Sequence, residues 1–238
     1  MPLPSTHVAS RAAWVGLVIT WRMAMSVDPM ISLIVVGAGG HAVSCIDLLE
    51  QTNGVKIVGV VGQQTEVGTT VCGYPVLGVD ARLTELRALA SGALVAVGQI
   101  RSPDLRIELY RQLVALDYEL PVIVAPAAYR SRHANINVGT VVMPGAIVNA
   151  GVEVGVNCII NSRALLEHGV AVGDHCHIST AAVVNGDAVI GEGTFVGSGA
   201  VVREGVRIGR RCVIGMGALV RHDLPDGSVF YGTSQHGA

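Results

Sequence analysis

Aliphatic residues recur at every sixth position through the C-terminal half of the chain. Between residues 124 and 220 this spacing covers seventeen positions, and sixteen of them hold Val, Ile or Leu, with Arg130 as the exception. A helix repeats near 3.6 residues and a strand near 2, so neither explains a sustained period of six. The spacing indicates a coil of short strands, in which each hexad lays down one flat face and then turns. We expect three hexads per coil, with the aliphatic side chains inside a prism.

A different pattern occupies the N-terminal half, where short apolar runs alternate with helical periodicity. Strands are predicted at 31–36, 56–61 and 94–97, and helices after the turn at Gly37, at 83–90 and from Ser102 onward. This alternation predicts a small doubly wound parallel sheet. We therefore divide the chain into residues 1–29, an α/β domain at 30–121 and the coil domain at 122–238. Residues 1–29 lack a convincing cleavage site, so we expect a flexible leader or an over-extended start.

Composition restricts the core and the partners. Half of the 238 residues are hydrophobic but only 4% are aromatic, so the core must be built from Val, Ile, Leu and Ala. The net charge of −2 gives no electrostatic footprint for nucleic acid or an anionic membrane. No apolar run reaches the roughly 18 residues that a membrane span needs. We expect neither nucleic-acid binding nor membrane insertion.

The five cysteines are an odd number without a CxxC pair, which argues against a disulfide framework or a zinc ribbon. Cys158, Cys176 and Cys212 share one position of the hexad, four residues after the aliphatic one. We expect them to pack as small apolar side chains, like the alanines at the same hexad position. Unpaired thiols favour a reducing cytoplasm.

A glycine-rich turn follows the first predicted strand. Its sequence, Gly37-Ala38-Gly39-Gly40-His41-Ala42, matches the dinucleotide fingerprint G-x-G-x-x-[GA]. A nicotinamide site also needs an acid after the second strand, where this chain has Gly62, Gln63 and Gln64. A nucleotide-sugar or phosphate site is therefore favoured over NAD, and a turn that binds nothing is the alternative. His41 favours a ligand, since its imidazole can meet a phosphate or a sugar hydroxyl.

Three histidines of the coil domain are candidates for chemistry: His168, His175 and His177. A metal site would combine them with Cys176, but alternate residues of a strand point to opposite faces, so Cys176 should point away from its neighbours. We predict no metal. The histidines are then either plain surface residues or, in the case of His168, a general base that takes a proton near neutral pH.

The hexads, the turn at Gly37 and the spacing from Asn161 to His168 together resemble the sialic acid O-acetyltransferase (NeuD-like) family of hexapeptide-repeat acyltransferases, which includes bacterial amino-sugar nucleotide N-acetyltransferases. The resemblance covers about residues 30–232. It implies a small Rossmann-like domain followed by a left-handed parallel β-helix, a homotrimer with active sites at subunit interfaces, and acetyl-CoA as co-substrate. It also implies site residues: His168 as catalytic base, Gly39, Gly40, His41 and Asn161 toward the nucleotide sugar, and His177, Gly186 and Ser198 toward acetyl-CoA.

Three departures from that family accompany the resemblance. The family usually has an acid directly after the catalytic histidine, where this chain has Gly169, so either Glu167 or a water substitutes, or His168 is a weaker base. The aspartates that commonly follow the second strand are replaced by Gly62 and Gln63. A C-terminal Gly-x-Pro-Ala signature is replaced by Gly232-Thr233-Ser234-Gln235, so contacts of that tail to CoA are not carried over.

The function that these observations favour is transfer of an acetyl group from acetyl-CoA to a sugar, in first place to the amine of a nucleotide-linked amino-deoxysugar. His168 would act as general base in a direct transfer, because no cysteine stands where a covalent intermediate would form. His177 or a nearby backbone N–H would steady the oxyanion. The alternatives are O-acetylation of a sialic or legionaminic type acid, and a scaffold that binds nucleotide sugar without turnover.

Overall fold

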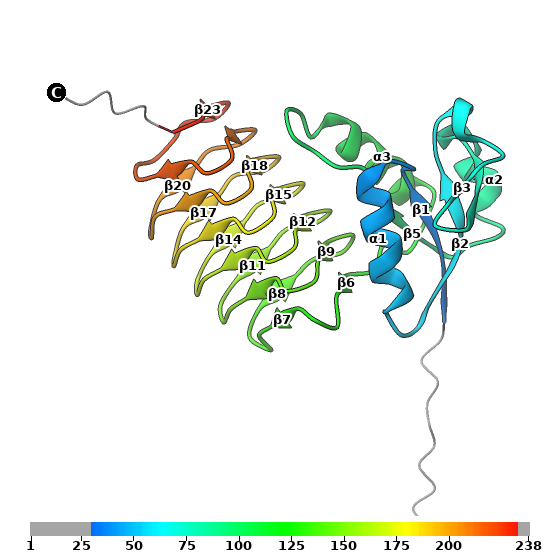
Figure 1. The fold of residues 1–238 in the computed structure, drawn as a ribbon, viewed down its shortest axis with the longest axis horizontal. Helices are drawn as coiled ribbons and strands as arrows, with labels where there is room; N and C mark the ends of the chain where they lie inside the picture. The colour runs from blue at the N-terminus through cyan, green and yellow to red at the C-terminus, as the bar shows by residue number, and fades with distance from the viewer. Residues whose placement is uncertain (1–29, 233–238) are drawn as a thin grey trace, which may run out of the picture.

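Two units follow one another along the chain in the computed structural model, which describes residues 30–232. An α/β domain comes first, and a stack of short strands extends from it toward the C-terminus (Figure 1). The leader predicted at 1–29 and most of the tail, from Thr233 onward, lie outside the described residues. No helix within 30–232 has both the length and the apolar character needed to cross a membrane.

The α/β domain is built on a five-stranded sheet of order β3-β4-β2-β1-β5, which is parallel except for β3. Its strands are β1 (Ile31–Val36), β2 (Val55–Val61), β3 (Thr70–Val71), β4 (Tyr74–Gly78) and β5 (Gly92–Val95). The helices are α1 (Gly40–Glu50), α2 (Leu83–Leu86) and α3 (Asp104–Ala115), with 3₁₀ turns η1 (Gln64–Glu66) and η2 (Asp80–Arg82). Successive residues of β1 face opposite sides of the sheet: Leu33 and Val35 pack with α1, whereas Ile34 and Val36 pack with α2 and α3. The predicted doubly wound sheet is confirmed.

In this domain the predictions misplace the end of one helix and miss one hairpin. The helix predicted at 83–90 ends at Leu86 and continues as turns. The β3–β4 hairpin was not predicted at all. Its two turn residues, Cys72 and Gly73, both have positive φ, +49° and +83°, which suits the tight turn of a two-residue hairpin. A cysteine at the first of these positions is not a recognisable turn signal, so the sequence pattern did not reveal the hairpin.

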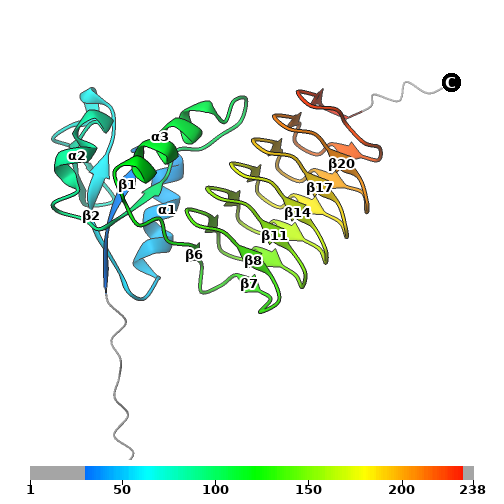
Figure 2. The ribbon, with the colours of Figure 1, turned by 180° about the vertical axis from the view of Figure 1, so that it is seen from behind.

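The second unit is a left-handed parallel β-helix of two-residue strands, seen from both sides in Figures 1 and 2. From β6 to β19, each strand pairs in parallel with the strand three elements later, 18 residues along the chain, so three hexads form one coil. At the C-terminal end, β21 pairs with β23. The pairing creates three flat faces. Face 1 holds β6 (Ile123–Val124), β9 (Val141–Val142), β12 (Ile159–Ile160), β15 (His177–Ile178), β18 (Phe195–Val196), β21 (Val213–Ile214) and β23 (Val229–Phe230). Face 2 holds β7 (Tyr129–Arg130), β10 (Ile147–Val148), β13 (Leu165–Leu166), β16 (Val183–Val184), β19 (Val201–Val202) and β22 (Leu219–Val220). Face 3 holds β8 (Asn135–Ile136), β11 (Glu153–Val154), β14 (Ala171–Val172), β17 (Val189–Ile190) and β20 (Arg207–Ile208).

The hexad positions point into the prism, as predicted. Every one of them from Ile136 to Val220 is buried, and together they form one continuous core. Arg130 is exposed in β7, the end strand of face 2. Because an end strand has no further coil beneath it, a charged side chain there stays in contact with water. Cys158, Cys176 and Cys212 are buried and unpaired in the core, in agreement with their predicted role.

Face 1 carries the α/β domain. The outward side chains of Ile123, Val141 and Ile159 join the same apolar cluster as α1 residues such as Cys45 and Leu49. This packing turns the first coils of the β-helix toward α1, as Figure 1 also shows. Outward residues of the next coils on face 1 therefore lie close to the glycine-rich turn that begins α1.

Candidate functional site

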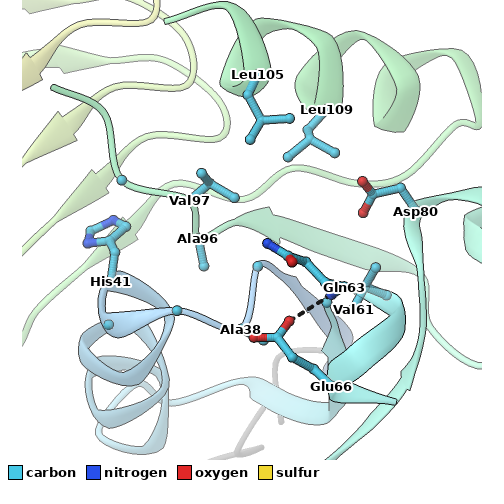
Figure 3. Close-up of a pocket in the computed structure, with 15 residues that line it drawn as sticks. Ala38, His41, Val61, Gln63, Glu66, Asp80, Ala96, Val97, Leu105 and Leu109 are labelled. Atoms are coloured by element: carbon cyan, nitrogen blue, oxygen red, sulfur yellow. Dashed lines mark hydrogen bonds between the residues drawn. The ribbon is translucent and has the colours of Figure 1, made fainter. Parts of the chain in front are cut away.

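A cavity of about 350 Å³ opens at the carboxyl ends of β1, β2 and β5. The chain moves outward from β1 to β2 and β4 on one side and places β5 on the other. Ligands of open α/β sheets bind at such a switch point. The walls come from the turn at Gly37, the end of β2, the segment after β5 and two leucines of α3 (Figure 3): Gly37, Ala38, Gly39, Gly40, His41, Val61, Gly62, Gln63, Glu66, Asp80, Ala96, Val97, Gly98, Leu105 and Leu109.

The glycines of the turn leave the floor of this cavity open. Gly37 has φ +120°, and a Cβ there would lie 2.9 Å from the Val97 side chain. A Cβ on Gly39 or Gly40 would meet nothing within 4 Å, so these residues border free space rather than packed side chains. Gly39 also precedes α1 without a side-chain cap. The helix therefore begins beside the cavity without a capping side chain, and a helix start of this kind favours an anionic ligand.

Two acids line the same cavity, although the sequence predicted none after β2. The Glu66 carboxylate reaches back to accept a hydrogen bond from the Gln63 N–H at 2.7 Å (Figure 3). A Cβ on Gly62 would lie 2.6 Å from that carboxylate, so only glycine leaves room for it. Asp80 stands across the cavity, and burial, followed by the nearby Glu108, raises its pKa. An acid from the 3₁₀ turn η1 thus lies over Gly62, the first residue after β2.

His41 stands between the cavity and the β-helix. Its ring centroid is 6.3 Å from that of His177 on face 1, and its Nε2 is 3.5 Å from the Cys45 Sγ. Burial, with smaller contributions from the charge of Arg106 and from His177, lowers the pKa of His41 to about 3. The ring is therefore neutral near pH 7 and offers a hydrogen bond to a ligand rather than a positive charge.

Both ring nitrogens of His177 form hydrogen bonds within the protein. Nδ1 donates to the Gln99 carbonyl at 2.8 Å, and Nε2 accepts from the Asn161 side-chain amide at 3.1 Å. Burial lowers the pKa of His177 to about 4, so the ring carries one proton, on Nδ1. No ring N–H remains to donate to an oxyanion. In this arrangement His177 orients Asn161 and ties the segment after β5 to the β-helix.

The neutral state of these two rings predicts an acid-labile fold. Burial lowers both pKa values from 6.5 to about 3 and about 4, so the unfolded chain binds more protons than the folded one between about pH 4 and 6.5. Stability then falls as the pH drops through that window, by up to about 1.4 kcal/mol per pH unit for each proton. We expect His177→Gln to flatten the slope of the unfolding free energy between about pH 5 and 6, measured by urea unfolding at fixed protein concentration.

The exposed His222 supplies the control for that measurement. The variant His222→Gln is expected to keep the wild-type slope. If His177→Gln also keeps it, the ring is not held neutral in the folded protein.

A buried arginine provides a second connection between the two units. Arg106 of α3 is 1% exposed and donates to the Val97 carbonyl and to both oxygens of Asn157 in the β-helix. The Asn157 amide in turn donates to His175 Nδ1 at 3.0 Å. His175 therefore contributes to the domain interface. No sequence pattern marks Arg106, because its burial depends on this interface. The interior Cys176 points away from both neighbouring histidines, and within 30–232 no group of three or more His, Cys, Asp or Glu is placed to hold a metal.

His168 lies at another corner of the prism, between faces 2 and 3, with a side chain about 70% exposed. Its ring covers Gly186 of the next coil, where a Cβ would lie 2.5 Å from the ring carbon Cε1. Gly186 was predicted to line the CoA groove, and the structure places it in the next coil, against the ring of the candidate base. Asp187 follows Gly186, and its Oδ1 is 3.9 Å from His168 Nδ1.

One chain brings the predicted residues together in two groups. His41, His177 and Asn161 are adjacent on the face 1 side, and Ser198 shares the corner between faces 1 and 2 with Asn161. Ser198 is exposed and its Oγ is 2.9 Å from the Ser179 Oγ. His168 and Gly186 lie across face 2, at its other border. A site that uses both groups requires either a long ligand along face 2 or a second copy of the chain.

Comparisons with known proteins agree with both units. Residues 32–113 match the family described as the PglD N-terminal domain, and residues 187–222 match the bacterial transferase hexapeptide family. PerB from Caulobacter crescentus, solved in complex with CoA and GDP-perosamine, is 33% identical with a TM-score of 0.78 over 83% of this chain and 92% of its own. The acetyltransferase domain of PglB from Neisseria gonorrhoeae, in complex with acetyl coenzyme A, is 32% identical with a TM-score of 0.75 over 84% and 95%. WeeI from Acinetobacter baumannii shares the fold at 21% identity over 83% and 95%, with a TM-score of 0.74. No curated protein matches the chain significantly.

Proposed function

Because the chain belongs to the hexapeptide-repeat sugar acetyltransferase family, we propose that it transfers an acetyl group from acetyl-CoA to the amine of a nucleotide-linked amino-deoxysugar. The observation that carries this proposal is the similarity to the Caulobacter crescentus protein, which extends over 92% of that protein and includes both units. That protein was solved with CoA and GDP-perosamine, an amino-sugar nucleotide. The five unpaired cysteines favour a reducing cytoplasm as the place of the reaction.

The cavity of the α/β domain supplies the nucleotide-sugar site in this proposal. The N–H groups at the start of α1, next to Gly39 and Gly40, suit a diphosphate. The neutral His41 ring stands between the cavity and the β-helix, and the Asn161 amide lies on the β-helix beside His177, where the sugar would project. Glu66 and Asp80 are acceptors for hydroxyl or base N–H groups at the far end.

His168 would act as the general base. Acetyl-CoA supplies the acetyl group as a thioester, and Gly186 and Ser198 border the surface along face 2 where we place it. The neutral ring of His168 removes a proton from the amine as the C–N bond forms and returns it to the departing thiolate as the C–S bond breaks. The transfer is direct, since the coil cysteines Cys158, Cys176 and Cys212 are enclosed in the prism and reach neither substrate.

A homotrimer would join the two groups of site residues. The six outward side chains of face 2 are all apolar or aromatic: Tyr129, Ile147, Leu165, Val183, Val201 and Leu219. Tyr129, Ile147 and Leu219 are exposed by 56%, 39% and 51%. A continuous apolar stripe of this kind marks an interface. The stripe is bordered by the corner of Asn161 on one side and that of His168 on the other, so a neighbouring copy packed on it would stand at both.

The trimer predicts a solution mass about three times the 24.6 kDa of the chain, measured by light scattering. The variant Leu165→Glu, which places a charge in the middle of the stripe, is expected to reduce the mass to that of one chain. The matched control is Arg207→Glu on face 3, an exposed position that is already charged. A single-chain mass for the wild type, or a trimer that tolerates Leu165→Glu, would contradict an interface on face 2.

The reaction itself is tested by release of CoA thiol. Purified protein is supplied with acetyl-CoA and either an amino-sugar nucleotide or a sialic acid, and the acetylated product is identified by mass spectrometry. Turnover of the amino-sugar nucleotide supports N-acetylation. Turnover of the sialic acid alone would favour the O-acetyltransferase alternative, and tight binding of nucleotide sugar without thiol release would favour the scaffold.

A further inference from the structure

Gly169 has no side chain that could orient His168, but the next coil toward the C-terminus supplies a carboxylate close to the ring. We infer that Asp187 is the positioning residue of His168, holding the proton on Nδ1 and leaving Nε2 free to act as base; this rests on the proposed function. Asp187 Oδ1 lies 3.9 Å from His168 Nδ1, with both side chains at the solvent-exposed corner between faces 2 and 3. Catalytic hydrogen bonds are often long in a structure without substrate and tighten in the ternary complex.

The backbone places the two residues together. Asp187 donates its N–H to the His168 carbonyl at 3.0 Å, so adjacent coils are joined at this point. Asp187 follows Gly169 by 18 residues, which is one full coil, and both have positive φ, +58° and +68°. The carboxylate therefore stands directly above the position at which the related enzymes are expected to carry their acid.

Two glycines make room for the pair. A Cβ on Gly169 would collide with the Asp187 Oδ1, so this chain has space for either a side chain at 169 or the present carboxylate, but not both without a shift. A Cβ on Gly186 would lie 2.5 Å from Cε1 and 2.7 Å from Nε2 of His168. The absence of both side chains lets the His168 ring and the Asp187 carboxylate lie side by side. The glycine at position 169 thus accompanies a carboxylate that lies one coil farther along, at position 187.

The other charged groups of this corner have partners of their own. Glu167 precedes His168 but accepts a hydrogen bond from the Asn149 amide at 3.0 Å. One coil above Asn185 and Gly186, Arg203 pairs with Glu204 at 3.5 Å. Among these acids Asp187 is the one within ion-pair distance of His168. A carboxylate on Nδ1 fixes the tautomer and stabilises the imidazolium that forms during proton transfer.

The test compares Asp187→Asn with a variant that moves the acid, Gly169→Asp/Asp187→Gly. Asp187→Asn is expected to lower kcat on the order of 10- to 100-fold with little change in either KM. The relocated acid is expected to recover most of the loss, because aspartate tolerates a positive φ and removal of the Asp187 side chain frees the space. The control Glu204→Gln, on the same corner, should behave as wild type.

A second measurement is independent of turnover. Ring ¹⁵N chemical shifts of His168 report its tautomer in the free protein, and Asp187→Asn is expected to reduce the Nδ1-protonated population. If the wild type transfers acetyl groups, but Asp187→Asn keeps kcat within twofold and the tautomer is unchanged, Asp187 does not position His168. If the wild type shows no transfer, the proposed function fails, while the tautomer still decides whether the pair exists.

Discussion

Replacing His168 by alanine is expected to lower kcat for acetyl transfer by about 10²- to 10⁴-fold, the range for loss of a positioned general base. The amine must lose a proton as it attacks the thioester, and His168 is the exposed imidazole that stands at the border of face 2 beside Asp187. KM for the nucleotide sugar should change little, because His41 and the cavity of the α/β domain are untouched. The measurement is steady-state thiol release with both substrates saturating.

The β-helix offers a matched control for this substitution. His222 lies 54 residues after His168, which is three coils farther along the same corner, and is likewise exposed. His222→Ala should retain the wild-type rate. A His168→Ala protein that transfers acetyl groups at an unchanged rate would rule out the general-base role and leave the scaffold or another base as the explanation.

A second large effect is expected on stability. Leu166→Ala should reduce the free energy of unfolding by about 2–5 kcal/mol, because a fully buried side chain is removed from a prism whose coils cannot easily collapse into the gap. Leu166 is 0% exposed and belongs to the continuous core of the β-helix. Urea unfolding followed by circular dichroism, at one protein concentration for all variants, measures the change.

Leu89 is the appropriate control, since it is 55% exposed in the turn after α2. Leu89→Ala should change the unfolding free energy by no more than about 0.5 kcal/mol. A loss of unfolding free energy below about 1 kcal/mol for Leu166→Ala would contradict tight packing of the β-helix interior around this side chain.

Prediction from sequence succeeded where one physical pattern dominates. A buried position at every sixth residue has no alternative explanation in helices or ordinary strands, so the coils, their faces and the interior cysteines followed directly. It failed where tertiary context decides. The β3–β4 hairpin has no common turn signature at Cys72, and α2 ends at Leu86 although its sequence continues to favour a helix.

The candidate site was predicted in its parts but not in its arrangement. Gly39, Gly40 and His41 line a cavity, and the Asn161 amide donates a hydrogen bond to His177. The prediction that His177 donates to an oxyanion does not fit the structure, because both of its ring nitrogens are already hydrogen-bonded. The sequence could not show this, since it does not place Gln99 or the domain interface beside His177.

The six-residue spacing alone was enough to establish the β-helix, because burial in a stacked prism repeats with the coil and leaves its mark on every hexad. Only the folded chain decided which acids lie at the two candidate sites. Glu66 lies over Gly62, and Asp187 lies beside His168 above Gly169. In both places a glycine occupies the position where an acid was expected, and a carboxylate from another part of the chain lies over it. Such a replacement depends on the space between neighbouring segments, which residue order along one strand or one loop does not reveal.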